Sequence, residues 1–259
     1  MKKHSYIKIF LYIILFLSCN EANTHKNIKT NLHQHNINTS KTEMINLINL
    51  LTGKFEPSDH KNFTLVDPKY HTKSKMFLQK ETLDAFINMR NAAQKEGINL
   101  RIVSGTRNFT DQQKIWDKKY KRFSKSISQP KDIINKIMIW SSMPGTSRHH
   151  WGTDIDINGF DEYFNGENQQ AIKDYNWLNK NADKFGFCQV YSEKDGINRR
   201  FGYNEEKWHW SYMPIASKYL KDYKKYINYN HLTKFLGSEH AKEMDIFNQY
   251  VFSISKKCQ

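Results

Sequence analysis

Apolar residues recur every three or four positions in several segments of this 259-residue chain, the spacing of helices with one buried face. Gly53, Gly97 and Gly186 each follow such a segment, and glycine is the usual residue just after a helix end. Thr110 with Gln113 forms a capping-box pattern, which predicts where another helix begins. The predicted helices are residues 43–51, 80–96, 110–123, 130–140 and 175–185, and the chain after residue 215 is also expected to be helical.

Shorter segments alternate between apolar and polar residues, which is the pattern of half-buried strands. We expect residues 198–203 to pair with the strand that contains Trp208-His209-Trp210, which alternates in the same way. The tryptophans of this region and Trp151 have two equally plausible places, the core or the wall of a cleft. The other predicted strands are residues 98–104, 153–157 and 187–191.

Two segments contain residue types that bind metal ions. Residues 147–156 hold two histidines and two aspartates around Gly152, and Glu206 precedes His209 by three positions. A catalytic zinc site needs three ligands of these types, one open coordination position and a nearby carboxylate that acts as a base. The combination therefore predicts a catalytic zinc centre, with Glu206 as the base.

The spacing leaves two choices open. Asp154 and Asp156 share one face of the predicted strand, because strand side chains alternate between faces. His149 and His150 are adjacent, and periodicity does not say which of them faces the site. Taken alone, each of these residues is more often an ordinary hydrogen-bonded polar group than a metal ligand.

Three motifs together resemble those of the VanY-like zinc D-alanyl-D-alanine carboxypeptidases, which are LAS metallopeptidases. Ser147, His149, Gly152 and Asp156 fit S-x-H-x-x-G-x-x-x-D, and residues 206–209 fit E-x-W-H. Residues 104–109 with Gln113 look like the S-G-x-R-S/N segment of that family. The resemblance extends from about residue 50 to about residue 214.

The resemblance implies roles for the motif residues. The ligands would be His149, Asp156 and His209, and Asp154, which stands where the family pattern commonly has Ala, would orient a ligand from behind. Glu206 and Arg107 would be catalytic, with Arg107 stabilising charge on the carbonyl oxygen. The predicted substrate-binding residues are Ser147, Gln113 and Trp208.

The implied fold is α+β, a single domain in which a small antiparallel sheet carries the zinc site and helices flank it, as in LAS and hedgehog-like proteins. The implied activity is hydrolysis of peptidoglycan stem peptides, above all removal of D-Ala from a D-Ala-D-Ala end. L,D-carboxypeptidase or endopeptidase activity on the same fold is one alternative. A zinc-stabilised wall-binding module without activity is another, although a structural zinc has no use for a base such as Glu206.

The chain is strongly basic, with a formal net charge of +14. An anionic wall polymer and nucleic acid would both suit this charge. We expect no nucleic-acid partner, because the lysines are spread along the chain and no nucleic-acid-binding motif is found.

The N-terminal residues predict export. A basic start and a short apolar run form a signal peptide over residues 1–18, and Phe16-Leu17-Ser18-Cys19 is close to a bacterial lipobox. We expect lipidation of Cys19, a flexible polar tether over residues 19–41, and an enzyme anchored to the membrane in the cell envelope, facing the periplasm. A plain secretory signal or an uncleaved anchor is the alternative.

The remaining chain divides into a zinc peptidase domain, residues 42–228, and a helical C-terminal extension, residues 229–259. Cys188 and Cys258 are the other cysteines, and in an oxidising compartment they would either pair or stay free. Neither cysteine has the surroundings of a catalytic thiol.

Overall fold

The structure, a computed structural model, describes residues 39–73, 75–199 and 201–259. The predicted signal peptide, most of the predicted tether and Cys19 lie outside the described residues. The chain divides into two compact units, Met1–Leu47 and Ile48–Gln259. The first described helix covers residues 39–52 and ends at Gly53, whose φ of 75° is the left-handed conformation that glycine adopts without strain.

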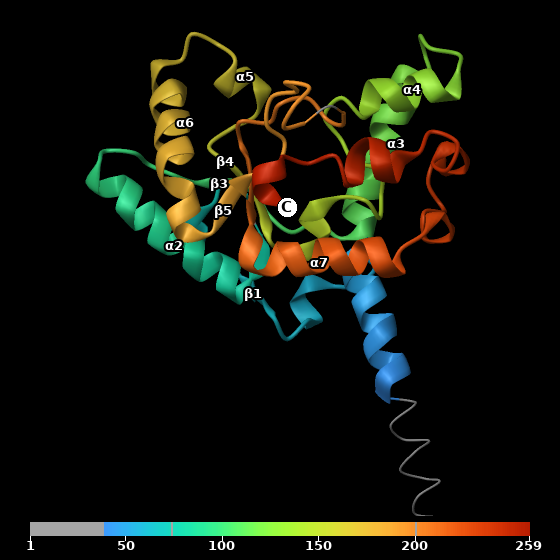
Figure 1. Cartoon of the computed structure of the whole chain (residues 1–259), viewed down its shortest axis with the longest axis horizontal. Helices are drawn as coiled ribbons and strands as arrows, with labels where there is room; N and C mark the ends of the chain where they lie inside the picture. Colours follow the sequence, from blue (N-terminus) through green and yellow to red (C-terminus); the bar gives the residue numbers. More distant parts are fainter. Residues whose placement is uncertain (1–38, 74, 200) are drawn as a thin grey trace, which may run out of the picture. The chain divides into compact units, whose positions relative to one another are not determined.

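The second unit contains helices of very different lengths (Figure 1). Gly97 and Gly186, both at positive φ, follow the ends of two helical segments, as the sequence predicted. The α-helices are α2 (Lys80–Lys95), α3 (Phe109–Phe123), α4 (Pro130–Ile137), α5 (Asp161–Phe164), α6 (Gln169–Asn181) and α7 (Met213–Tyr226).

Two antiparallel sheets complete the unit. A two-stranded sheet pairs β1 (Phe63–Leu65) with β2 (Phe77–Gln79). The larger sheet has the strand order β3-β4-β6-β5. Its strands are β3 (Ile102–Ser104), β4 (Asp154–Ile157), β5 (Phe187–Gln189) and β6 (His209–Tyr212). The predicted α+β class with a small antiparallel sheet flanked by helices is therefore confirmed.

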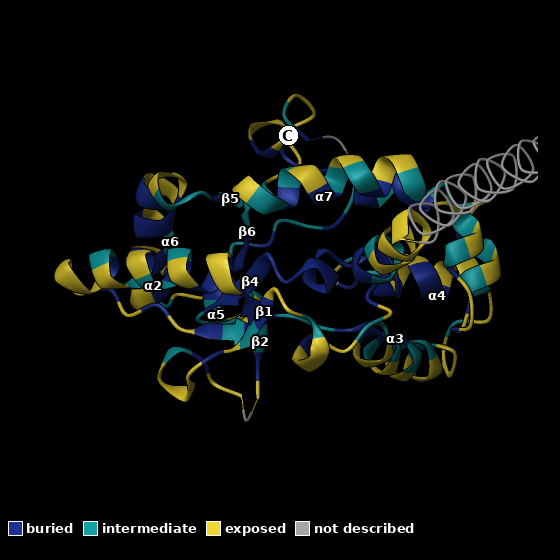
Figure 2. Cartoon of the chain, turned by 90° about the horizontal axis from the view of Figure 1, so that it is seen from below, coloured by how far each residue is buried: buried dark blue, intermediate teal, exposed yellow. Residues whose placement is uncertain are grey.

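One face of the larger sheet is covered by α2 and α6 (Figures 1 and 2). Ile155 and Ile157 of β4 and Trp210 of β6 pack there against Phe86 of α2 and Leu178 of α6. Removing such large side chains from water supplies about 1.5–3 kcal/mol each. Because strand side chains alternate, Asp154, Asp156 and His209 are directed to the opposite face.

Some predicted elements differ from the observed ones. The side chain that caps α3 belongs to Asn108, which accepts a hydrogen bond from the Asp111 amide, so the capping box assigned to Thr110 is wrong. The described residues of 198–203 form no strand, because β6 pairs with β4 and β5 instead. Local sequence patterns do not determine which distant strands will pair with β6.

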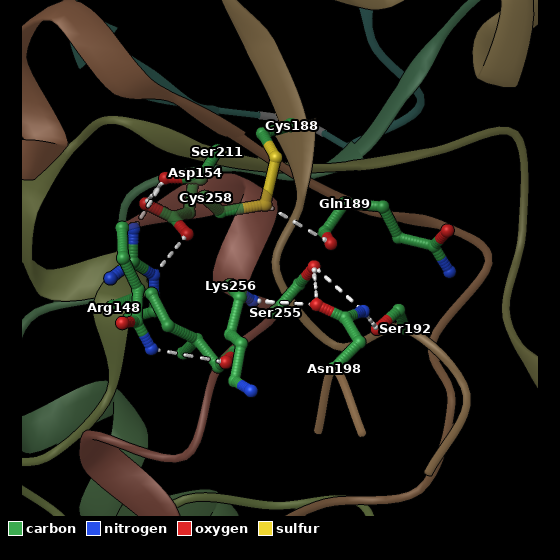
Figure 3. Close-up of a disulfide and its surroundings, with 12 residues drawn as sticks. Arg148, Asp154, Cys188, Gln189, Ser192, Asn198, Ser211, Ser255, Lys256 and Cys258 are labelled. Carbon is green, nitrogen blue, oxygen red and sulfur yellow. Dashed lines mark hydrogen bonds and ion pairs between the residues drawn. A yellow bond between two sulfur atoms is a disulfide. The ribbon is translucent and has the colours of Figure 1, made fainter. Parts of the chain in front are cut away.

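The C-terminal segment after α7 contains short 3-10 turns and one π-helical turn, Phe247–Val251, in place of a regular helix. It ends against β5, where the Ser255 amide donates to the Val190 carbonyl and Cys258 forms a disulfide with Cys188 (Figure 3). The tail therefore lies along the outer strand of the larger sheet. Among the described helices, none combines the length and apolar character needed to cross a bilayer.

Candidate metal centre

A short 3-10 turn, Arg148–Trp151, leads into β4 through Gly152. Gly152 has a φ of 70°, and a Cβ placed there would lie 2.4 Å from the Phe63 ring. Both the backbone conformation and the close approach require glycine. The turn places His149 beside the first residues of β4.

The pairing of β4 with β6 joins the two predicted metal-binding segments. Asp156 lies directly opposite His209 in the antiparallel register, and Ser104 of β3 lies opposite Asp156 on the other side. Side chains of directly opposed residues share a face about 5 Å apart. Residues about fifty positions apart in the chain thus meet at the centre of the sheet.

His149, Asp156 and His209 offer one ligand atom each, and these atoms lie within 4.8 Å of one another. The contacts are 3.4 Å from His149 Nε2 to Asp156 Oδ2 and 3.3 Å from His209 Nδ1 to Asp156 Oδ1. His149 Nε2 and Asp156 Oδ1 are buried and form no hydrogen bond with any described residue. Unpaired buried polar atoms are costly, so this donor set fits a cation bound between them.

His150 is held away from this cluster, although it is adjacent to His149. Its Nδ1 donates to the Arg107 carbonyl at 2.7 Å, and its Nε2 accepts from the Gly145 amide at 3.0 Å. Both ring nitrogens are therefore occupied, in one neutral tautomer. His149 instead donates from Nδ1 to the Gly105 carbonyl at 2.9 Å, which leaves its Nε2 facing the cluster.

Asp154 lies behind the cluster. Its carboxylate accepts hydrogen bonds from Arg148 Nε at 2.9 Å and from the hydroxyls of Thr153 and Ser211. His209 Nε2 also donates to it at 2.9 Å, which turns His209 Nδ1 toward Asp156. Asp154 thus orients a histidine, and Figure 3 shows it between Arg148 and Ser211.

Burial and neighbouring charges set the protonation of this centre. Burial and the nearby Arg107 guanidinium lower the pKa of His149 to about 4, so its imidazole is neutral at pH 7 and able to bind a cation. Burial alone would raise the pKa of Asp156, but His149 and His209 together hold it below its usual range. Asp156 is therefore ionised.

Glu206 is adjacent to the cluster. Its Oε2 lies 3.3 Å from His209 Nδ1, and its side chain is 7% exposed, so the carboxylate is within reach of a group bound between the ligand atoms. Burial raises the pKa of Glu206, and the neighbouring His209 opposes this rise. A carboxylate whose pKa is raised toward neutrality is a better proton acceptor.

The cluster opens into a cavity of about 450 Å³. Of the residues predicted from the sequence, Arg107, Ser147 and Trp208 line this cavity, together with Glu206 and the three cluster residues. Trp151 and Trp210 are buried in the core, which settles their place for this fold.

Gln113 does not lie in the cavity, because its amide donates to the Lys234 carbonyl at 2.5 Å. Its neighbour Gln112 lines the cavity instead. The signal that distinguishes them is helical spacing, since Gln112 shares a helix face with Ile115 and Lys119 and Gln113 does not.

The fold and this centre define an α+β protein with a buried His-Asp-His cluster, a neighbouring carboxylate and an open cavity. The chain belongs to the VanY family, described as D-alanyl-D-alanine carboxypeptidase, and residues 75–215 match the sequence profile of that family. The family resemblance predicted from the motifs is therefore confirmed.

Two relatives show the extent of the similarity. YodJ of Bacillus subtilis, which carries a provisional carboxypeptidase assignment, is 31% identical over 188 residues, covering 69% of this chain and 62% of that protein. A D-alanyl-D-alanine carboxypeptidase of Enterococcus faecalis is 30% identical over 128 residues, covering 49% of this chain and 45% of that protein. The chain therefore spans about half to three fifths of the length of these relatives.

Solved structures of similar chains include VanYB in complex with D-alanine-D-alanine, which is 24% identical with a TM-score of 0.47. The match covers 65% of this chain and 86% of that one. The LdcB LD-carboxypeptidase is 25% identical with a TM-score of 0.48, and the match covers 68% of this chain and 81% of that one.

Proposed function

We propose that this protein is a zinc-dependent carboxypeptidase that removes the terminal D-Ala from peptidoglycan stem peptides ending in D-Ala-D-Ala. The observation that carries the proposal is the convergence of His149, Asp156 and His209 on one point, with the Glu206 carboxylate beside it and a cavity in front. Membership of the family supports the substrate class.

His149 Nε2, an Asp156 carboxylate oxygen and His209 Nδ1 would hold the zinc ion. Bound there, zinc would polarise the scissile carbonyl and lower the pKa of the attacking water. The Glu206 carboxylate accepts the proton of that water and returns it to the departing amine. Arg107 stabilises the negative charge that develops on the carbonyl oxygen. Asp154 keeps His209 in the tautomer that directs Nδ1 toward the site.

The test of this function is D-Ala release from a synthetic pentapeptide stem by the zinc-loaded protein. Glu206→Gln removes the base and is expected to lower kcat by at least about a hundredfold while the zinc content stays at that of the parent. Glu205→Gln is the matched control, because Glu205 is the adjacent acid and bonds to Tyr175 outside the cavity.

Three outcomes would contradict the proposal in different ways. Full activity of Glu206→Gln would exclude the assigned base. Cleavage of cross-linked wall fragments without release of free D-Ala would make the enzyme an endopeptidase, and cleavage of tetrapeptide stems alone would make it an L,D-carboxypeptidase. Binding to wall without any cleavage would indicate the non-catalytic module.

We also propose that the protein is anchored to the membrane in the cell envelope by a lipid on Cys19. The lipobox-like pattern supports this, and so does the Cys188–Cys258 disulfide, because structural disulfides persist in oxidising compartments outside the cytoplasm. Metabolic labelling with a palmitate analogue should mark the parent and be lost in Cys19→Ala. Labelling that survives this substitution would rule the anchor out.

A further inference from the structure

One wall of the cavity is a single face of α3. Gln112, Ile115 and Lys119 follow one another at spacings of three and four residues, and all three line the cavity. A helix rises about 1.5 Å per residue, so Lys119 lies roughly 10 Å further along α3 than Gln112. The far end of this wall therefore carries an ammonium group.

Lys119 is half-buried and has one polar contact among the residues that the structure describes. Its Nζ donates to the Ser141 hydroxyl at 2.5 Å, and Ser141 also lines the cavity. An ammonium group has three donors, so two remain. In the described part of the chain no carboxylate lies within ion-pair distance of this group, including Asp161 and Glu162 of α5, which border the same cavity.

A second cation faces the same space. Arg107 lines the cavity, and its buried Nε has no hydrogen-bond partner among the described residues. Burial, followed by the charges of Arg107 and Arg122, lowers the pKa of Lys119, while Glu206 raises it. Lys119 is thus close enough to Arg107 and Glu206 to sense their charges. Neither cation has an ion pair with a described carboxylate, and two partly buried cations of this kind favour binding of an anion.

The remaining arginine of the cavity and the acids of the metal centre have partners or roles already. Arg148 is paired with Asp154, and Asp156 and Glu206 belong to the metal centre and its base. If Arg107 acts on the carbonyl oxygen of the scissile bond, Lys119 is the cation left for another anionic group of the substrate. A peptide that loses its last residue has such a group one residue beyond the scissile bond, its terminal carboxylate.

We propose that Lys119 is a specificity-determining residue that binds the free C-terminal carboxylate of the substrate. The proposal rests on the proposed function and deepens it, because it selects peptides with a free terminal residue over peptides whose chain continues. A cross-linked or amidated terminus has no charge for Lys119 to pair with. The geometry therefore favours carboxypeptidase over endopeptidase action.

The experiment uses two stem pentapeptides that differ only at the end, one with a free carboxylate and one with a carboxamide. The zinc-loaded parent should prefer the free acid in kcat/KM. In Lys119→Gln we expect kcat/KM for the acid to fall about 10- to 100-fold, mainly through KM, with little change for the amide. Lys119→Arg should keep most of the preference, because it keeps the charge.

Lys118→Gln is the matched control, since Lys118 is the adjacent, exposed lysine of α3 and should leave both rates unchanged. A binding measurement separates this proposal from the proposed function. Calorimetry on the inactive Glu206→Gln protein should show tighter binding of the acid than of the amide, and Lys119→Gln added to it should remove the difference. If the parent cleaves neither peptide, the proposed function fails, but the binding comparison still decides the role of Lys119.

Two results would overturn the role of Lys119. An equal fall of kcat/KM for both peptides in Lys119→Gln would mean that the lysine supports the wall of the cavity and does not bind the terminal carboxylate. An unchanged preference for the acid in that variant would mean that another group binds the carboxylate.

Discussion

Two neighbouring histidines of this protein face in different directions relative to the metal-binding cluster. His149 and His150 are adjacent, yet one faces the cluster and the other forms two backbone hydrogen bonds behind it. A Cβ at Gly53 would lie 2.4 Å from His150 Nδ1, so the glycine allows the ring to approach the chain this closely. The choice between the two histidines depends on these contacts, which the sequence does not display.

The environment of His150 predicts a dependence of stability on pH. Burial lowers its pKa to about 3, well below the ordinary value of about 6.5. Between pH 6.5 and pH 3, His150 is therefore protonated in the unfolded chain and neutral in the folded chain. The contribution of neutral His150 to the free energy of unfolding is complete above pH 6.5 and is lost as the pH falls toward 3. The loss across that range is about 3–5 kcal/mol.

Denaturant unfolding of metal-free protein at several pH values tests this prediction. His150→Gln should be less stable at pH 7, and its unfolding free energy should fall less steeply between pH 6.5 and pH 4, by about one proton. A slope identical to that of the parent would mean that His150 is not the neutral buried group described.

At the scale of elements, the strand that ends the larger sheet is covered by a segment from the far end of the chain. The Cys188–Cys258 bridge and the Ser255 amide fasten the tail to β5 and the residue after it (Figure 3). Next to the bridge, the Gln189 side chain donates from Nε2 to the Glu206 carbonyl at 3.3 Å. Cys188 lies opposite Ser211, whose hydroxyl donates to Asp154. The tail thus stabilises a strand that directly supports the site.

Removal of this bridge should therefore destabilise the protein. A closed loop with a sequence separation of 70 residues restricts the unfolded chain, and its opening should cost about 2–4 kcal/mol of unfolding free energy. We expect Cys188→Ser with Cys258→Ser to melt at a lower temperature and to be insensitive to reductant, while reductant lowers the melting temperature of the parent. A parent that melts unchanged under reduction would show that the bridge adds no stability.

At the scale of the whole molecule, the basic charge and the cavity would contribute to the proposed function in different ways. The net charge of +14 favours approach to an anionic polymer but has no geometric selectivity. Under that function, selectivity belongs to the cavity, which is lined by Lys119, Arg107 and the metal-binding cluster. Association with wall should therefore weaken with salt more than hydrolysis of a short stem peptide does.

The sequence by itself determined the residue types, the approximate helices and strands, and the family, because periodicity and motif spacing follow from covalent geometry within a few residues. Tertiary structure alone decided the two choices that the sequence left open, since His150 bonds to backbone and Asp154 bonds to Arg148. It also showed that the predicted Gln113 lies outside the cavity, which Gln112 lines. It also decided that the tail reaches Cys188 and that Lys119 joins the cavity. Most of these contacts join residues far apart in the chain, and their proximity depends on strand pairing and packing, which local patterns do not encode.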